Sequence, residues 1–374
     1  MDLKKKLELI KRNTIEVIGE EELGDLISKN EKLKHYIGFE ISGKIHLGTG
    51  LMCMSKIKDF IEAGVDCTIF LADWHTWINN KLKGDRDAIK RVAVGYFKEG
   101  MKASMKCVKG NPKKINFLLG TDLYNKQDDY WATMIDVSKN ITLSRIQRSI
   151  TIMGRKEEGS IDFAMLIYPS MQVADIFSQK VNLAHAGMDQ RKAHVIARDV
   201  ALKLKISPLL NKKGNKMKPL AVHHHLILGL GKPPVWPVKK ENLREVWAAL
   251  KMSKSKPDTC IFIHDSPEEI KRKIKKAFCP EKEIEFNPLI DWVEKLIFPI
   301  IKKLEVKRPK KFGGNLRYTS LEKLKKDFKL GVLHPADLKS AVADSLIILL
   351  KPARDHFSNG KPKKMLEELN GLLK

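Results

Sequence analysis

The first two hundred residues alternate short apolar runs with segments of helical periodicity. The apolar runs resemble strands that are buried on both faces. The segments between them repeat apolar residues at i, i+3, i+4 and i+7, as amphipathic helices do. This alternation predicts an α/β fold with a Rossmann-type parallel sheet and crossover helices. Strands are expected at residues 35–40, 65–73, 114–120 and 181–187, and helices at about 47–63, 87–104, 161–179 and 189–204.

The pattern changes twice along the chain. Residues from about 121 to 160 are mostly helical and polar, which indicates an insertion into the α/β core. Residues 205–250 are irregular, and after about residue 265 amphipathic helices replace the strands. We therefore expect a catalytic-type α/β domain over 1–265 and an all-helical domain over 266–374.

Charge and cysteine usage narrow the class of function. The formal net charge is +25, from 70 Lys and Arg against 45 Asp and Glu, which favours a polyanionic partner such as nucleic acid. The alternative is the lysine-rich surface of a thermostable protein. The five cysteines are scattered without a CxxC pair, which favours a reducing compartment over disulfides or a zinc site. With no signal peptide or apolar span, the sequence predicts a cytoplasmic protein without membrane attachment.

Two short motifs are suited to nucleotide phosphates. His46, Leu47 and Gly48 fall at the turn between the first strand and its helix, where backbone N–H groups favour phosphate. Alone, such a turn is common. The second motif is KMSKS at 251–255, followed by Lys256 and Pro257, which suits a mobile cationic loop. Alone, it would be an ordinary solvated basic turn.

Together the two motifs resemble the HIGH and KMSKS signatures of class I aminoacyl-tRNA synthetases, in the same order and about two hundred residues apart. One departure is Thr49, which stands where the signature has its second histidine. The resemblance implies ATP as substrate with Mg²⁺, and no structural metal. It implies catalytic roles for His46, Gly48, Lys251 and Lys254, and further ATP contacts from Gly187, Asp189, Met252 and Ser253.

Longer strings resemble tyrosyl-tRNA synthetases of the archaeal and eukaryotic type, over nearly the whole chain. They are YIGFEISGKIHLG (36–48), LADWHTW (71–77), YPSMQVADI (168–176), AGMDQRKAH (186–194), KRPKKFGG (307–314) and LHPADLK (333–339). Tryptophanyl enzymes share the architecture but differ after the Asp-Gln pair, where this chain has RKAH. The resemblance implies activation of L-tyrosine by ATP, transfer of tyrosine to tRNA(Tyr), and a homodimer formed through the insertion.

The segment 163–177 supports a polar site independently. Tyr168, Gln172 and Asp175 share one helical face, yet the segment is otherwise apolar. A buried Asp175 would require a hydrogen-bonding partner, although a capping or salt-bridged acid is the alternative. By resemblance, Asp175 and Tyr36 bind the phenolic hydroxyl of tyrosine. The resemblance assigns the rest of the tyrosine site to Glu40, Asp73, His75, Tyr168, Gln172 and Gln190.

Residues for tRNA follow mainly from the resemblance. It implies that Phe312 and His334 stack on anticodon bases and that Asp337 binds the first of them. It assigns the first base pair of the acceptor stem to Arg148 and Arg191. The residues themselves predict only a helix that begins near Asp337 and buries Leu338, Val342, Leu346 and Leu349.

Several alternatives remain at this stage. A tryptophanyl-tRNA synthetase is the nearest rival, and a non-catalytic tRNA-binding relative or a small-molecule nucleotidyltransferase would be different classes of protein. The tract His223–His225 resembles a metal site, but three consecutive histidines lack helical or sheet-paired spacing, so we expect a structural role. The segment 205–250 and Thr49 receive no role.

Overall fold

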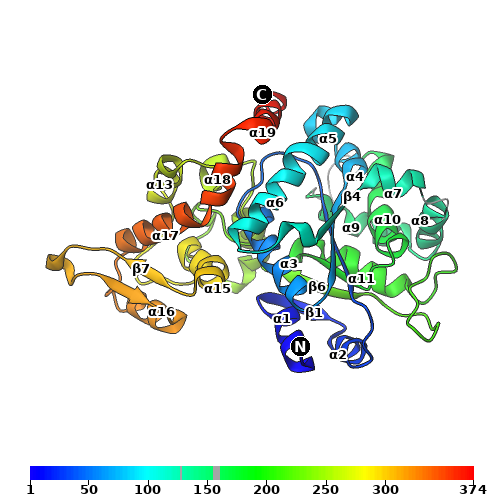
Figure 1. Ribbon diagram of the computed structural model, residues 1–374, viewed down its shortest axis with the longest axis horizontal. Helices are drawn as coiled ribbons and strands as arrows, with labels where there is room; N and C mark the ends of the chain where they lie inside the picture. The colour runs from blue at the N-terminus through cyan, green and yellow to red at the C-terminus, as the bar shows by residue number, and fades with distance from the viewer. Residues whose placement is uncertain (127–128, 155–160) are drawn as a thin grey trace.

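A six-stranded sheet forms the centre of the computed structural model, which describes residues 1–126, 129–154 and 161–374 (Figure 1). The strand order is β1-β6-β5-β2-β3-β4. The strands are β1 (Thr14–Ile18), β2 (Lys34–Phe39), β3 (Asp66–Leu71), β4 (Ile115–Leu119), β5 (Leu183–Gly187) and β6 (Leu220–His224). All neighbours pair in parallel except β1, which runs antiparallel to β6 at the edge. The predicted α/β sheet is confirmed.

Strands β1 and β6 were not predicted. The expectation that residues 205–250 are irregular is wrong for Leu220–His224, which pair with both β5 and β1. The reason is the histidine tract, which interrupts the apolar run that would otherwise indicate a buried strand. Hydrogen bonds between imidazoles make this tract compatible with the interior, as described below.

The order of the strands creates a crevice at one edge of the sheet. The chain runs outward from β2 to β3 and β4, then returns to place β5 on the other side of β2. Open parallel sheets bind ligands at such a switch point, beyond the carboxyl ends of the strands. The chain segments that leave β2 and β5 therefore border a natural site.

Helices cover both faces of the sheet. Side chains alternate along each strand, so Ile37 and Leu183 join one core while Tyr36 and Ala184 join the other. The helices of this part are α1 (Leu3–Lys11), α2 (Glu20–Ser28), α3 (Cys53–Glu62), α4 (Asp73–Ile78), α5 (Arg86–Val92), α6 (Lys98–Cys107), α7 (Gly120–Lys126), α8 (Tyr130–Lys139), α9 (Leu143–Ser149), α10 (Phe163–Ser178), α11 (Arg191–Val200) and α12 (Leu243–Leu250). The expected insertion corresponds to α7, α8 and α9, and its residues 127–128 and 155–160 lie outside the described part.

The region after residue 265 is mainly helical, as expected. Its helices are α13 (Pro267–Lys275), α14 (Pro288–Trp292), α15 (Phe298–Ile301), α16 (Leu321–Lys329), α17 (Pro335–Leu349), α18 (Lys351–Phe357) and α19 (Gly360–Leu372). The expectation of no further strands is wrong, because β7 (Leu304–Val306) and β8 (Leu316–Tyr318) form an antiparallel pair. Strands of three residues are too short to show a period of two in sequence. In the described residues no helix combines the length and apolar character that crossing a membrane requires.

The last helices return to the first domain. Figure 1 shows α17, α18 and α19 running from the C-terminal lobe back over α6 and α5. The Phe357 and Tyr96 rings pack with centroids 5.4 Å apart, and Arg91 pairs with Glu368 at 3.0 Å. One continuous hydrophobic core consequently joins the sheet to the C-terminal helices.

Candidate active site

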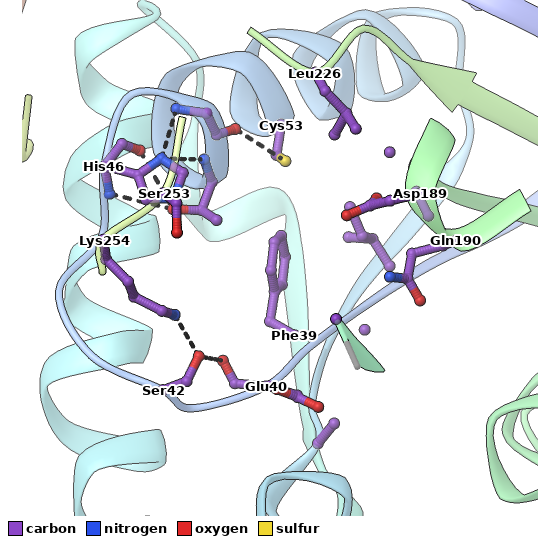
Figure 2. Close-up of a pocket in the computed structure, with 18 of the residues that line it drawn as sticks. Phe39, Glu40, Ser42, His46, Cys53, Asp189, Gln190, Leu226, Ser253 and Lys254 are labelled. Atoms are coloured by element: carbon purple, nitrogen blue, oxygen red, sulfur yellow. Dashed lines mark hydrogen bonds between the residues drawn. The ribbon is translucent and has the colours of Figure 1, made fainter. Parts of the chain in front are cut away.

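A cavity of about 770 Å³ opens at the carboxyl ends of β2 and β5. In Figure 2, His46, Ser253 and Lys254 lie together, and Asp189 and Gln190 face them across the cavity. Most of the expected ligand-binding residues line it. They are Tyr36, Glu40, His46, Gly48, His75, Tyr168, Gln172, Asp175, Gly187, Asp189, Gln190, Lys251, Met252, Ser253 and Lys254.

Asp175 lines the cavity from α10. Its side chain is almost completely buried, and Tyr130 Oη donates a hydrogen bond to Oδ1 at 3.0 Å. Burial raises the pKa of Asp175, and burial together with the charge of Asp175 raises the pKa of Tyr36. The polar partner required by a buried carboxyl is therefore Tyr130, a residue that the sequence did not single out. Asp175 and Tyr36 share one cavity, as the tyrosine assignment requires.

Two buried polar atoms at the cavity have no hydrogen-bond partner within the described part of the chain. His75 Nε2 lies 3.7 Å from Asp175 Oδ2, beyond hydrogen-bonding range, while His75 Nδ1 contacts Tyr124 Oη at 3.3 Å. Burial lowers the pKa of His75 to about 3, so this imidazole is neutral. Gln172 Oε1 is the second such atom. Buried polar groups are normally paired, so both atoms are available to a polar ligand.

A second set of polar side chains lines the cavity. Glu40 Oε1 accepts hydrogen bonds from Tyr168 Oη at 2.9 Å and from Asn79 Nδ2 at 2.8 Å. Gln172 Nε2 donates to Gln190 Oε1 at 3.2 Å. Side-chain oxygens of this kind accept hydrogen bonds from an ammonium group, and the amide N–H groups donate to a carboxylate. This set of side chains therefore suits the two ends of an amino acid.

His46 is held as a neutral hydrogen-bond donor. Its Nδ1 accepts the backbone N–H of Gly48 at 3.1 Å, so the proton of the neutral ring lies on Nε2. Burial, with smaller effects from Lys254 and Lys251, lowers the pKa of His46 to about 3. A Cβ atom on Gly48 would lie only 3.0 Å from His46 Cε1, so glycine is needed for this close approach.

Backbone pairing fixes the turn that carries His46. It leads into a π-helical turn, η1 (Gly48–Met52), and then α3. Leu47 N donates to Ile261 O at 3.0 Å, and Ile263 N donates to Ile45 O at 3.1 Å. The first signature is thus hydrogen-bonded to the segment that follows the second. Thr49, which also lines the cavity, exchanges hydrogen bonds with the His46 backbone at 3.2 and 3.3 Å.

Lysines surround the mouth of the cavity. Lys251 Nζ pairs with Asp189 Oδ2 at 3.0 Å, and Lys254 Nζ donates to Ser42 Oγ. Burial lowers the pKa of Lys254 to about 8. Lys44 and Lys81 also line the cavity but were not predicted. Lys44 could have been found from its place two residues before His46, whereas nothing in the sequence marks Lys81.

Asp73 does not line the cavity, although it was expected at the tyrosine site. Its buried carboxylate accepts hydrogen bonds from Thr121 N at 3.0 Å and Thr121 Oγ1 at 2.5 Å. The side chain at the start of α4 therefore turns toward the start of α7. Asp73 holds these two helices together, while His75 extends into the cavity.

The expected tRNA residues lie outside the cavity. Arg191 forms two hydrogen bonds of 2.8 Å with Glu16, and Arg148 donates to Ser144 Oγ at 2.6 Å. Phe312, between β7 and β8, is 62% exposed. His334 and Asp337 lie together at the start of α17, where His334 Nδ1 accepts the N–H of Ala336 at 3.1 Å. Leu338, Val342, Leu346 and Leu349 are buried, which confirms the predicted core face of α17.

The three consecutive histidines belong to the interior. His223 contacts His194 and Glu16 at 3.0 Å each, His224 contacts His185 at 2.8 Å, and His225 contacts Asp291 at 2.7 Å. These bonds support the predicted structural role, and His224 and His225 additionally form part of the cavity wall. Over the described ranges, no three potential metal ligands come together.

Comparisons with known proteins agree on one family. The model for class I tRNA synthetases of the tryptophan and tyrosine group matches residues 28–351. A tyrosine–tRNA ligase of Thermococcus sibiricus is 58% identical over 360 residues, covering 96% of each chain. The ligase of Thermococcus kodakarensis is 57% identical and covers 99% of each. The crystal structure of the Pyrococcus horikoshii tyrosyl-tRNA synthetase with L-tyrosine has a TM-score of 0.96 at 55% identity, covering 99% of this chain and 100% of its own.

Proposed function

Because this chain belongs to the class I tyrosyl-tRNA synthetases, we propose a division of labour among its cavity residues for the reaction of that family. The enzyme is a tyrosine–tRNA ligase, which activates L-tyrosine with ATP to tyrosyl-adenylate and pyrophosphate and then transfers tyrosine to tRNA(Tyr). The observation that carries the residue assignments is the convergence of Asp175, Tyr36 and His46 with the KMSKS loop on one cavity.

In this proposal Asp175 and Tyr36 bind the phenolic hydroxyl. The hydroxyl group can donate to one and accept from the other, which leaves no polar atom unpaired. Phenylalanine would leave both groups buried without a partner, a penalty that excludes it; the handling of this substrate pair by tyrosyl enzymes is an established example of the rule. Glu40, Tyr168, Gln172 and Gln190 hold the ammonium and carboxylate groups. The neutral His75, whose Nε2 has no hydrogen-bond partner among residues 1–126, 129–154 and 161–374, lies against Asp175 and keeps this part of the cavity polar.

For activation, a carboxylate oxygen of tyrosine attacks the α-phosphorus of ATP, and the bond from that phosphorus to the bridging oxygen of pyrophosphate breaks. The protein supplies position and positive charge rather than a covalent nucleophile. His46 donates from Nε2, and Lys251 and Lys254 neutralise the leaving phosphates. Gly48, Gly187, Asp189, Met252 and Ser253 enclose the nucleotide. ATP enters as its Mg²⁺ complex, consistent with the preference of Mg²⁺ for substrate phosphates.

For transfer, the 3′-terminal hydroxyl of tRNA(Tyr) attacks the carbonyl carbon of the adenylate and AMP leaves. We assign the acceptor stem to Arg148 and Arg191, and the anticodon to Phe312, His334 and Asp337. The net charge of +25 supports attraction of the polyanion. We also propose a homodimer through α8 and its neighbours, and a cytoplasmic location, which five free cysteines support.

The test is ATP–pyrophosphate exchange with tyrosine, phenylalanine and tryptophan in separate reactions. Exchange dependent on tyrosine alone is expected. Exchange that remains selective for tyrosine after Asp175→Ala would remove Asp175 from the recognition of the hydroxyl. Exchange unaffected by Lys254→Ala would remove that lysine from activation.

A further inference from the structure

The C-terminal helix α19 reaches the ATP end of the cavity. Leu373, directly after α19, lines the cavity together with Gly43, Lys44 and Lys254. Its side chain is 46% exposed, so it does not belong to the buried core of the C-terminal lobe. A large apolar side chain half exposed at a phosphate-binding mouth has no role in the reaction described above.

Gly43 brings Leu373 and Lys254 together. A Cβ atom on Gly43 would lie 3.3 Å from Lys254 Cδ and 3.7 Å from Leu373 Cδ2. The lysine stem and the leucine therefore lie over the same face of this glycine. Its φ of +133° also favours glycine, so the surface under both side chains is bare backbone. Lysine stems commonly pack on apolar groups while the ammonium stays polar.

We propose that Leu373 is a positioning residue for Lys254: the C-terminal helix supplies an apolar side of the slot that directs this ammonium toward the ATP phosphates. This inference rests on the proposed role of Lys254 in activation. It adds that the ATP site is built from the C-terminal lobe as well as from the α/β domain. Lysine loses substantial rotamer freedom when held, so a preformed slot reduces that cost when ATP binds.

The docking of α18 and α19 gives Leu373 a fixed position. Glu368 pairs with Arg91 at 3.0 Å, and Met365 lies over Gly95, where an added Cβ would meet it at 3.6 Å. Phe357 packs on Tyr96, whose hydroxyl accepts the backbone N–H of Ile45, beside His46. Helix α18 thus packs against the tyrosine that supports the first signature, while α19 leads to Leu373 beside Lys254.

The experiment is steady-state ATP–pyrophosphate exchange with the full-length Leu373→Ala variant. We expect kcat/KM for ATP to fall by about three- to tenfold, because a half-exposed apolar contact is lost. KM for tyrosine should stay unchanged, since Leu373 is not among the residues assigned to tyrosine. The Leu373→Met variant should keep most of the wild-type kcat/KM for ATP, because methionine keeps the apolar volume.

Leu202→Ala is the matched control, since Leu202 is 49% exposed and lies just after α11, outside the cavity. This variant should leave kcat/KM for ATP and KM for tyrosine unchanged. A Leu373→Ala enzyme with wild-type kcat/KM for ATP would overturn the inference, as would equal losses for ATP and tyrosine. Failure of the wild-type enzyme to exchange with tyrosine would instead contradict the proposed function, so the two failures are distinguishable.

Discussion

At Lys254, removal from solvent and attraction to phosphate act on the same ammonium group. Burial disfavours the charged form and lowers the pKa of Lys254 to about 8. In the proposed role of Lys254, the ATP phosphates favour the charged form again, so we expect ATP and a proton to bind this lysine cooperatively. The charge on Lys254 is therefore sensitive to pH in the free enzyme more than in the ATP complex.

This coupling predicts a pH dependence. Lysine is charged below its pKa, so kcat/KM for ATP should be constant below about pH 7 and decline as the pH rises through about 8. In Lys254→Arg, whose guanidinium stays charged, that decline should vanish even if the overall rate is lower. Pyrophosphate exchange measured from pH 6 to about 10 checks both enzymes. The same decline in the arginine variant would assign it to another group.

Selectivity provides the second residue-scale prediction. Tyr36→Phe removes one of the two proposed polar partners of the substrate hydroxyl and keeps the ring. We expect kcat/KM for tyrosine to fall about ten- to hundredfold while the value for phenylalanine stays the same or rises. Tyr318→Phe is the matched control, because that buried hydroxyl donates to Asp327 in the C-terminal lobe. Equal loss for both amino acids would show a packing effect instead of recognition.

At the scale of the elements, the loop between β7 and β8 presents an exposed surface that is separate from the cavity. Its connection carries the exposed Phe312, with Lys311 Nζ 5.0 Å from the ring centroid. Arg308 fixes the base of this loop by donating to Gly314 O at 2.6 Å and Val332 O at 2.9 Å. A rigid loop that exposes an aromatic ring beside a cation suits stacking on an unpaired base.

Phe312→Ala should therefore affect charging but not activation. Loss of one stacked base is expected to lower kcat/KM for tRNA by about five- to hundredfold, with pyrophosphate exchange unchanged. Leu330→Ala, at 63% exposure against 62% for Phe312, controls for loss of an exposed apolar side chain. Aminoacylation with tRNA(Tyr) transcripts measures the difference. Unchanged charging would remove Phe312 from the tRNA surface.

Helices and strands with a clear hydrophobic periodicity could be predicted from the sequence. Elements whose burial depends on side chains from other parts of the chain could not. Helix α10 and strands β2, β3, β4 and β5 appear in sequence because their apolar pattern is set locally. Strand β6 was not predicted because its histidines can be buried only when His194, His185 and Glu16, which belong to other elements, form hydrogen bonds with them. For the same reason Asp175 could be identified, but not its partner Tyr130, which lies 45 residues away along the chain.

Part of the candidate site could be predicted from the sequence, and part became visible only in the structure. The positions of His46, Asp175 and the KMSKS loop in one cavity agree with expectation. The direction of the Asp73 side chain, toward Thr121, could not be predicted because the sequence places this residue at a strand end without giving its orientation. Lys81 and Leu373 were missed because tertiary contacts alone bring them to the cavity.

At the scale of the whole molecule, the insertion and the adjoining start of α10 expose apolar side chains. Ile135 on α8 is 56% exposed, Trp131 one turn earlier is 38% exposed, and Leu143 and Phe163 are 62% and 78% exposed. Such side chains favour burial against another subunit. We expect Ile135→Glu to convert the proposed homodimer to a monomer, as measured by size-exclusion chromatography with light scattering.

Ile348→Glu is the control for that experiment, because Ile348 is 73% exposed on α17, far along the chain from the insertion. It should leave the dimer intact. A wild-type protein that runs as a monomer at micromolar concentration would contradict the homodimer itself. A dimer that survives Ile135→Glu would move the interface away from α8.

The return of α18 and α19 to the α/β domain limits how this protein can be divided. A fragment ending at residue 265 would lose Leu373 and would uncover Tyr96, which is now 1% exposed and packs on Phe357. Such a fragment is expected to aggregate, although it would carry both signatures. Recombination that exchanges C-terminal lobes between genes would therefore have to replace the chain after residue 265 together with its docking face around Tyr96.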